Sequence, residues 1–181
     1  MYMKNNTIFQ IKFFVSIFFI SVGVSGFSQF EFKEAIFQKT FFSGIPISMT
    51  DINGDYTDDL IVLDQGKRLW IGLNSGQGHY FWNNLNAESN SVLWSVNIAD
   101  LDRNGYQDII LGGSNDGIKV YYQYQQGFQK VGLDQSLFFS QSATVYDINR
   151  DGWMDYTICD DNAKSKVYIN RKGILELDTN L

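Results

Sequence analysis

The chain has 181 residues, of which 44% are hydrophobic and 16% aromatic, a composition typical of a globular protein rather than a disordered one. This length allows one modest domain with a hydrophobic core. The formal net charge of −6 argues against a nucleic-acid partner, because proteins bind nucleic acids through basic surfaces.

Residues 1–28 have the features of a secretory signal peptide. Lys4 and Lys12 precede an uncharged apolar run at 13–26, and small residues occupy the positions that matter for cleavage. We expect cleavage before Gln29, which predicts a secreted or cell-surface protein. The alternative is a membrane anchor, but the run is shorter than the ~20 residues that span a bilayer. We therefore expect no membrane span after cleavage.

The rest of the chain repeats one unit three times. The units are aligned on Asp51, Asp100 and Asp147, which lie 49 and 47 residues apart. Each unit contains short β-branched or aromatic runs separated by Gly, Asn, Asp and Ser, the pattern of strands and turns. No window of 12 or more residues in this part shows a convincing helical period.

The expected strands follow in chain order within each unit. They lie at 45–50, 60–63, 69–73 and near 80–81; at 93–99, 109–111, 118–122 and near 128; and at 142–146, 156–158, 167–169 and near 174–175. A period near 48 residues with about four strands per unit is typical of propeller blades. We expect an all-β partial propeller with blades at about 42–90, 91–140 and 141–181, all within a repeat region at 29–181.

An acidic loop follows the first expected strand of each unit. Oxygen-bearing side chains occupy loop positions 1, 3, 5 and 9, and alternate residues of a tight loop can turn toward one point. We expect these to be metal ligands, with the backbone carbonyl of position 7. The predicted ligands are Asp51, Asn53, Asp55, Thr57 and Asp59; Asp100, Asp102, Asn104, Tyr106 and Asp108; and Asp147, Asn149, Asp151, Trp153 and Asp155.

Calcium is the expected ion, since it takes six to eight oxygen ligands in irregular geometry. Magnesium requires stricter octahedral geometry, and zinc prefers the Cys and His ligands that these loops lack. The loops are not EF-hands, because Val62, Leu111 and Ile158 stand at position 12 instead of glutamate. The alternative is an ordinary polar turn, which one loop alone would not distinguish from a metal site.

The three loops differ at position 6, where we expect a positive φ. Gly105 and Gly152 fill this position in the second and third loops, whereas the first has Tyr56. A non-glycine residue in that conformation costs about 1 kcal/mol. We therefore expect the first loop to be the weakest site.

The remaining reactive residue types do not form a catalytic constellation. Cys159 is the only cysteine, so an internal disulfide is excluded, and we expect it to be a small core residue. His79 is the only histidine, and we expect it to be a solvated turn residue. No nucleophile arrangement or cofactor motif is present, so we expect no enzymatic activity.

The three loops, Asp-x-(Asn/Asp)-x-(Asp/Asn)-x-x-x-Asp with apolar runs after them, resemble the FG-GAP/VCBS repeat family, whose relatives include the integrin α-subunit propeller. The turn at 74–81 resembles the Asn-Gly-x-Gly-x-Phe ending of that family, and 170–175 is a poorer match. The resemblance covers about residues 42–175. It implies four-stranded antiparallel blades, with calcium held in the hairpin between the first two strands. It also implies a secreted or cell-surface role in adhesion or ligand binding.

Three blades are fewer than the four to eight of a closed propeller. The chain could be a fragment of a longer protein, which we favour, or it could assemble with copies or partners, or its array could be open. We expect a calcium-binding module with a protein or carbohydrate ligand. The alternatives are a non-catalytic structural fragment and an accessory domain of a polysaccharide-active enzyme. Trp70, Trp82, Trp94 and Trp153 could stack sugars, but packing between blades is the expected role of most of them.

Overall fold

The computed structural model describes residues 38–42, 47–87, 89–114, 117–133 and 139–180. The chain divides into compact units at 1–33 and 34–181, and only the second contains described residues. The predicted signal peptide lies outside them. Over the described ranges there is no helix, and hence none that could cross a membrane.

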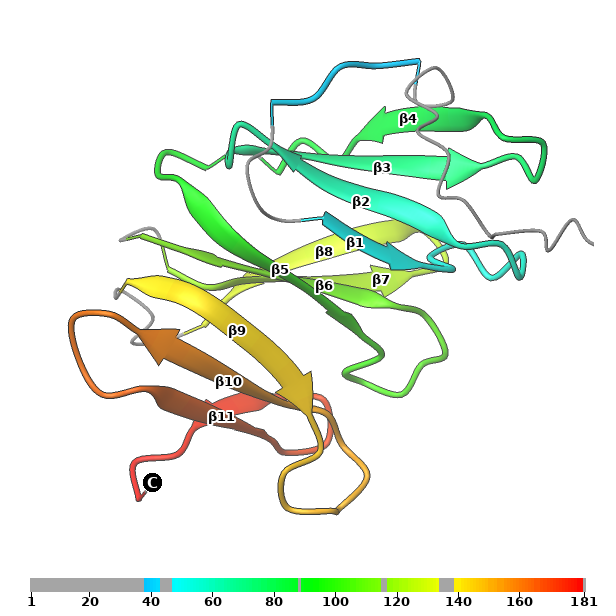
Figure 1. Cartoon of the computed structure of the whole chain (residues 1–181). Helices are drawn as coiled ribbons and strands as arrows, with labels where there is room; N and C mark the ends of the chain where they lie inside the picture. Colours follow the sequence, from blue (N-terminus) through cyan, green and yellow to red (C-terminus); the bar gives the residue numbers. More distant parts are fainter. Residues whose placement is uncertain (1–37, 43–46, 88, 115–116, 134–138, 181) are drawn as a thin grey trace, which may run out of the picture. The chain divides into compact units, whose positions relative to one another are not determined.

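Twelve strands form three four-stranded antiparallel sheets (Figure 1). In each sheet the strands lie side by side in chain order. The first sheet contains β1 (Ile47–Thr50), β2 (Asp59–Asp64), β3 (Arg68–Asn74) and β4 (Tyr80–Asn84). The second contains β5 (Leu93–Ala99), β6 (Asp108–Gly113), β7 (Lys119–Tyr124) and β8 (Gly127–Gly132). The third contains β9 (Ser140–Tyr146), β10 (Asp155–Asp160), β11 (Lys166–Asn170) and β12 (Leu175–Leu177). The predicted all-β fold of three four-stranded antiparallel blades is confirmed.

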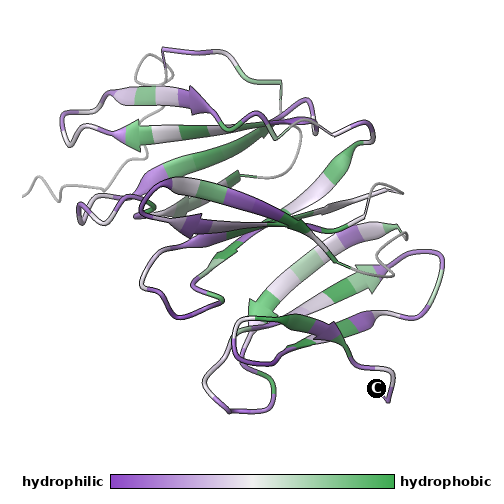
Figure 2. Cartoon of the chain, turned by 180° about the vertical axis from the view of Figure 1, so that it is seen from behind, coloured by the Kyte–Doolittle hydropathy of each residue, from purple (hydrophilic) through white to green (hydrophobic). Residues whose placement is uncertain are grey.

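The second strands of the first two sheets are almost continuously apolar because both of their faces are covered. Every residue of β2 and of β6 is buried. Strands buried on both faces form continuous hydrophobic runs rather than alternating ones. Along the chain, Figure 2 shows apolar residues concentrated in the strands and hydrophilic residues in the loops.

Two hydrophobic clusters join the three sheets. The first packs Ile61 and Leu63 of β2 with Ile109 and Leu111 of β6. The second packs residues such as Ile110 of the middle sheet with the third sheet's Tyr156 and Ile158. Successive residues of β6 thus serve opposite interfaces, as the two-residue period of a strand requires. The first strands of neighbouring sheets lie side by side, β1 by β5 and β5 by β9 (Figure 1).

The prediction for Cys159 is wrong: its side chain is exposed. The neighbours Tyr156 and Ile158 point toward the middle sheet and are fully buried. Because successive strand residues face opposite sides, Cys159 falls on the other face of β10, away from that core. His79, in contrast, is an exposed turn residue as expected, and its Nδ1 lies 2.8 Å from Nε2 of Gln38.

Candidate metal-binding loops

Each acidic loop connects the first strand of a sheet to the second. We call these loop 1 (51–59), loop 2 (100–108) and loop 3 (147–155). All three begin where the first strand ends, and they lie on the same side of the array (Figure 1). Their last residues, Asp59, Asp108 and Asp155, begin the second strands.

The position-9 aspartate of each loop is completely buried and acts as an anchor. In loop 2, the Leu101 N–H donates to Oδ2 of Asp108 at 2.8 Å, and the Gln123 N–H donates to Oδ1 at 2.8 Å. Loops 1 and 3 repeat both bonds at equivalent residues. A carboxylate that accepts two backbone N–H groups holds the loop to two strands at once.

The position-1 aspartate closes the other end of each loop. Oδ1 and Oδ2 of Asp100 accept hydrogen bonds from the Asn104 and Gly105 N–H groups at 3.1 and 3.0 Å. Asp51 and Asp147 accept the equivalent bonds in loops 1 and 3. These contacts direct the position-1 carboxylate into the loop.

Positions 3 and 5 are joined by one amide–carboxylate hydrogen bond in every loop. Loops 1 and 3 have the asparagine at position 3, and it donates to the aspartate at position 5. Loop 2 has the reverse order, since Asn104 at position 5 donates from Nδ2 to Oδ2 of Asp102 at 3.1 Å. At positions 1, 3, 5 and 9 together, each loop therefore carries three carboxylates and one amide.

The backbone adopts a positive φ at positions 4 and 6 of all three loops. In loop 1 these are Gly54 (78°) and Tyr56 (67°), and in loop 2 they are Arg103 (57°) and Gly105 (88°). Loop 3 repeats the loop 2 order with an arginine and a glycine. Each loop thus holds one non-glycine residue in the left-handed region. The strain that we expected to weaken loop 1 alone is therefore common to all three.

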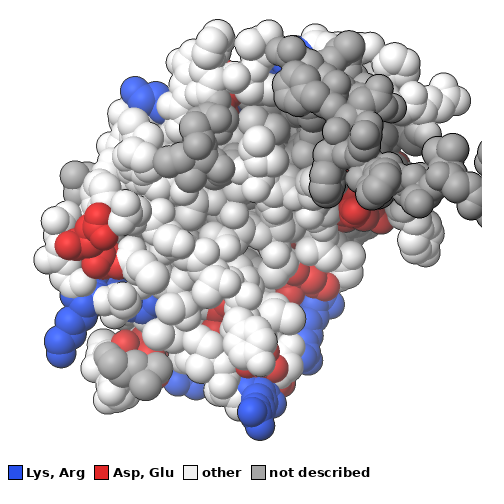
Figure 3. Space-filling view, in the orientation of Figure 1, with Lys and Arg blue, Asp and Glu red and all other residues white. Residues whose placement is uncertain are grey.

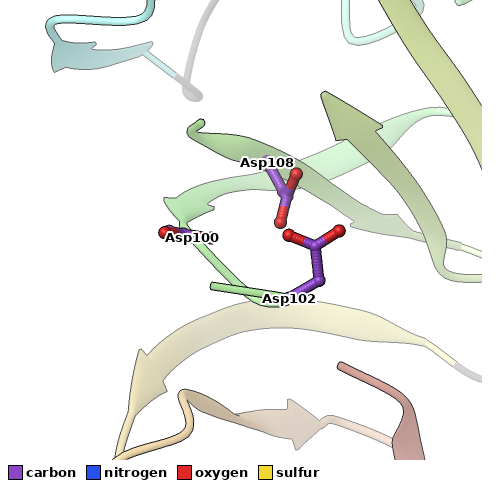
Figure 4. A group of neighbouring side chains, drawn as sticks. All are labelled: Asp100, Asp102 and Asp108. Atoms are coloured by element: carbon purple, nitrogen blue, oxygen red, sulfur yellow. The ribbon is translucent and has the colours of Figure 1, made fainter. Parts of the chain in front are cut away.

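Loop 2 concentrates its negative charge most closely. Oxygens of Asp100, Asp102 and Asp108 all lie within 4.8 Å of one another, and no other group of three acidic, His or Cys side chains in the described ranges is as close. Figure 4 shows the Asp102 and Asp108 carboxylates facing each other, with Asp100 across the loop. The predicted ligands of loops 1 and 3 make hydrogen bonds equivalent to those of loop 2, but their carboxylates do not lie this close together.

Burial and neighbouring charge shift the pKa of Asp108. Removal from solvent raises the pKa of its carboxyl to about 6, the Gln123 and Leu101 N–H groups oppose this, and Asp102 and Asp100 add to it. Burial likewise raises the pKa of Asp59, against the Asn74 and Ile52 N–H groups. Ionised Asp108 is thus under-compensated by its protein surroundings, although a cation would stabilise it.

The residues of loop 2 fit a hard divalent cation. All of the converging side-chain donors are carboxylate oxygens, with the Asn104 amide beside them. Each carboxylate oxygen that accepts an N–H retains a second lone pair. The cluster could therefore hold a metal ion, and its oxygen donor set favours calcium or magnesium over zinc.

The comparison with known families matches the part of the chain that carries these loops. The model of the FG-GAP-like repeat aligns with residues 51–111 and again with 100–158. The two matches together span 51–158, which is more than half of the 181 residues. The chain belongs to the FG-GAP-like repeat family. No curated protein matches it significantly.

Each match of the FG-GAP-like repeat covers two loops, and loop 2 is common to both. Loop 2 is also supported by the next sheet, as loop 1 is through the Gln123 side chain. The Asn170 side chain on β11 donates to the Leu101 carbonyl at 2.8 Å, and Tyr122 of the middle sheet donates to the Gly173 carbonyl at 2.8 Å. A Cβ on Gly173 would lie 3.2 Å from Cβ of Asp102, so this turn packs directly on the loop.

Sequence reasoning missed the residues that tie one FG-GAP-like repeat to the next. Asn74, Gln123 and Asn170 each lie 15 residues after their position-9 aspartate and donate a backbone N–H to it. The side chains of Gln123 and Asn170 also donate to the position-2 carbonyl of the preceding loop. This constant spacing of amide residues was visible in the sequence and is the signal that could have revealed them.

A second link joins loops 2 and 3. Nε of Arg103 donates to the Gly152 carbonyl at 3.1 Å, and Nη2 donates to the same oxygen. Its guanidinium lies 4.5 Å from the Trp153 ring centroid. Trp153 therefore packs between loops, in line with the packing role expected for most tryptophans.

The charged side chains on the visible surface are not gathered into one large patch of a single sign. On the face drawn in Figure 3, acidic side chains form several separate groups, with Lys and Arg side chains near some of them. Most of that face carries no charge. The electrostatics relevant to an ion are therefore those within each loop.

Proposed function

We propose that this FG-GAP-like repeat protein is an exported, non-catalytic binding module that calcium stabilises. The observation that carries the proposal is the Asp100, Asp102 and Asp108 cluster, whose oxygens lie within 4.8 Å of one another in a loop that recurs three times. The repeat family and its propeller-like sheets support a binding module.

Loop 2 would hold the ion through the carboxylates of Asp100, Asp102 and Asp108, with the Asn104 side-chain oxygen and the Tyr106 carbonyl completing the donor set. Calcium would neutralise charges that otherwise repel each other across the loop. The hydrogen bonds to Asp100 and Asp108 keep these carboxylates in place in the protein itself, so little reorganisation is needed. Loops 1 and 3 would bind more weakly, because their carboxylates are farther apart.

Calcium in these loops would act on structure rather than on a reaction. Each loop joins the first two strands of a sheet, and loop 2 also contacts the following sheet through Asn170 and Gly173. An ion there would stiffen the hairpin and the junction between sheets together. The module would then present its sheet-connecting turns to a protein or carbohydrate ligand outside the cell, in adhesion or ligand capture.

Isothermal titration of the purified, chelator-treated protein with calcium tests the proposal. We expect saturable binding whose tightest site is lost, or weakened at least ~10-fold, by Asp102→Asn, because the ligand charge count sets calcium affinity. Asp161→Asn removes an exposed charge outside the loops and serves as the matched control. No binding by the unsubstituted protein, or equal losses in both variants, would contradict the proposal.

A further inference from the structure

The outer strands of the second and third sheets, β8 and β12, border a cleft of about 570 Å³. The cleft continues the hydrophobic interface between these sheets, since Leu133, Leu175 and Leu177 contribute both to its lining and to the second hydrophobic cluster. We propose that an extended peptide of a partner protein binds here, adding as a strand to the outer edge of β12 and placing apolar side chains in the cleft. This gives the binding module proposed above a site and a ligand class, but it does not depend on calcium in the loops.

The cleft is present because the outer part of the second junction is less filled than that of the first. Between the first two sheets, Phe128 of β8 packs against the hydrophobic cluster. At the same register position of the third sheet stands Leu175, which is smaller. The strand that carries it is also shorter, with three residues in β12 against six in β8.

Apolar side chains line this cleft at positions where another sheet has a polar residue or a glycine. The three pairs, each at one register position, are Val131 for Asn83, Leu177 for Lys130, and Ile174 for Gly127. Ile174 is 63% exposed and Val131 is 38% exposed. Exposed apolar residues gathered beside a cleft of this size are typical of a binding site, and they favour an apolar ligand group.

The outer edge of β12 offers backbone hydrogen-bonding groups beside the same cleft. β12 is the edge strand of its sheet, and no strand in the described part of the chain pairs with its outer side. The Asp178 N–H donates to the Val167 carbonyl on β11 at 2.8 Å. Because the N–H and C=O groups of successive strand residues alternate in direction, those of Leu175 and Leu177 point away from β11.

These two features together define the ligand as an extended peptide. A strand added to β12 would bond to the backbone of Leu175 and Leu177, and it would direct every second side chain toward the cleft. The side chains of both leucines already point to that side, because they pack with the middle sheet. Strand addition combines main-chain bonds for affinity with pockets for alternate side chains, and this edge provides both. A small apolar molecule would use only the lining.

Fluorescence anisotropy of a labelled peptide of alternating threonine and leucine, with a lysine at each end, tests the proposal on the purified protein. We expect saturable binding, with a dissociation constant raised at least about 10-fold by Ile174→Asp or by Val131→Asp, because each places a charge in the apolar lining. Phe81→Asp is the matched control, because Phe81 is 66% exposed on β4, another edge strand. It should leave the dissociation constant unchanged. Circular dichroism confirms that each variant folds.

Two methylated forms of the peptide separate strand addition from general apolar binding. One carries N-methyl groups on all leucine amides and the other on all threonine amides. An added strand turns only one alternate set of N–H groups toward β12, so one form should lose binding and the other should largely keep it. Equal affinities of the two forms would overturn the proposal.

Amide hydrogen exchange measured by NMR tests whether the edge is open in the free protein. The Leu175 and Leu177 amides should exchange faster than the Asp178 amide, and the peptide should slow them. Slow exchange without peptide would mean that another part of the chain or a second copy already pairs with β12, and it would overturn the proposal. So would a lack of peptide binding. If the protein still binds calcium in that case, only this inference fails and the proposed function stands.

Discussion

At the residue scale, the burial that lets the position-9 aspartates anchor the strands also destabilises their charged form when no ion is present. Complete burial and two backbone N–H bonds make Asp108 an anchor between strands. The same burial, with Asp102 and Asp100 nearby, disfavours its charged form. A bound cation would resolve this conflict, which is why the loop chemistry favours a metal site over a plain turn.

This conflict predicts opposite pH responses with and without calcium. The pKa of Asp108 is raised from its ordinary value of 3.8 to about 6, so the folded protein binds this proton more tightly than the unfolded chain does. In chelator, the contribution of Asp108 to the free energy of unfolding should therefore increase as pH falls from about 6 to about 4. In calcium it should decrease over the same range, because protonation displaces the ion.

Carbon-13 NMR titration of the aspartate carboxyl groups measures this directly. In chelator, one loop carboxyl should titrate near pH 6, and Asp108→Asn should remove that signal. In calcium the same carboxyl should titrate well below this value. A midpoint that does not move when calcium is added would contradict the assignment of Asp108 as a ligand.

At the element scale, the end of the third strand links each sheet to its own loop and to the previous one. Asn170 is fully buried, and its amide donates to the Leu101 carbonyl of loop 2 and the Met154 carbonyl of loop 3. Its Oδ1 accepts from the Gly173 N–H at 2.7 Å. Asn74 in the first sheet makes the own-loop bond and a turn bond, but no described sheet stands before the first one to supply the other acceptor.

Asn170→Ala should therefore destabilise the protein more than Asn74→Ala. The first substitution leaves three buried or partly buried backbone groups without partners, which costs roughly 2–4 kcal/mol of the free energy of unfolding. The second affects solvent-accessible groups and should cost less than about 1 kcal/mol. Urea denaturation of the two variants measures the difference. Equal losses would show that the inter-sheet bond adds nothing.

Much of this architecture could be predicted from the sequence because the three repeats have recognisable loops at a regular spacing. Three in-phase loops and apolar runs at fixed offsets predicted the strands, and the family resemblance predicted their antiparallel order. The outcome for Cys159 could not be obtained this way. Its burial depends on whether another sheet covers the third one, which no local pattern encodes. The shared strain at Arg103 and Arg150 was also missed, because only glycine positions had been used to locate positive φ.

At the scale of the whole molecule, the three sheets are bound by two hydrophobic clusters and by loops that contact the following sheet. Metal in loop 2 would therefore affect the junction of two sheets and not one hairpin alone. The chain has a single cysteine and so no internal disulfide, and a bound ion would add a stabilising link between its strands. Calcium should accordingly raise the stability of the entire array in one cooperative step.

Thermal unfolding of the purified protein with calcium and with excess chelator measures this stabilisation. We predict a melting temperature several degrees higher in calcium, rising further with ion concentration as linkage requires. The shift should be largely lost in a variant that combines Asp108→Ala with Asp155→Ala and retained in Asp161→Asn. Superimposable melting curves in calcium and chelator would contradict stabilisation by calcium and would leave these loops as ordinary turns of a β-repeat protein.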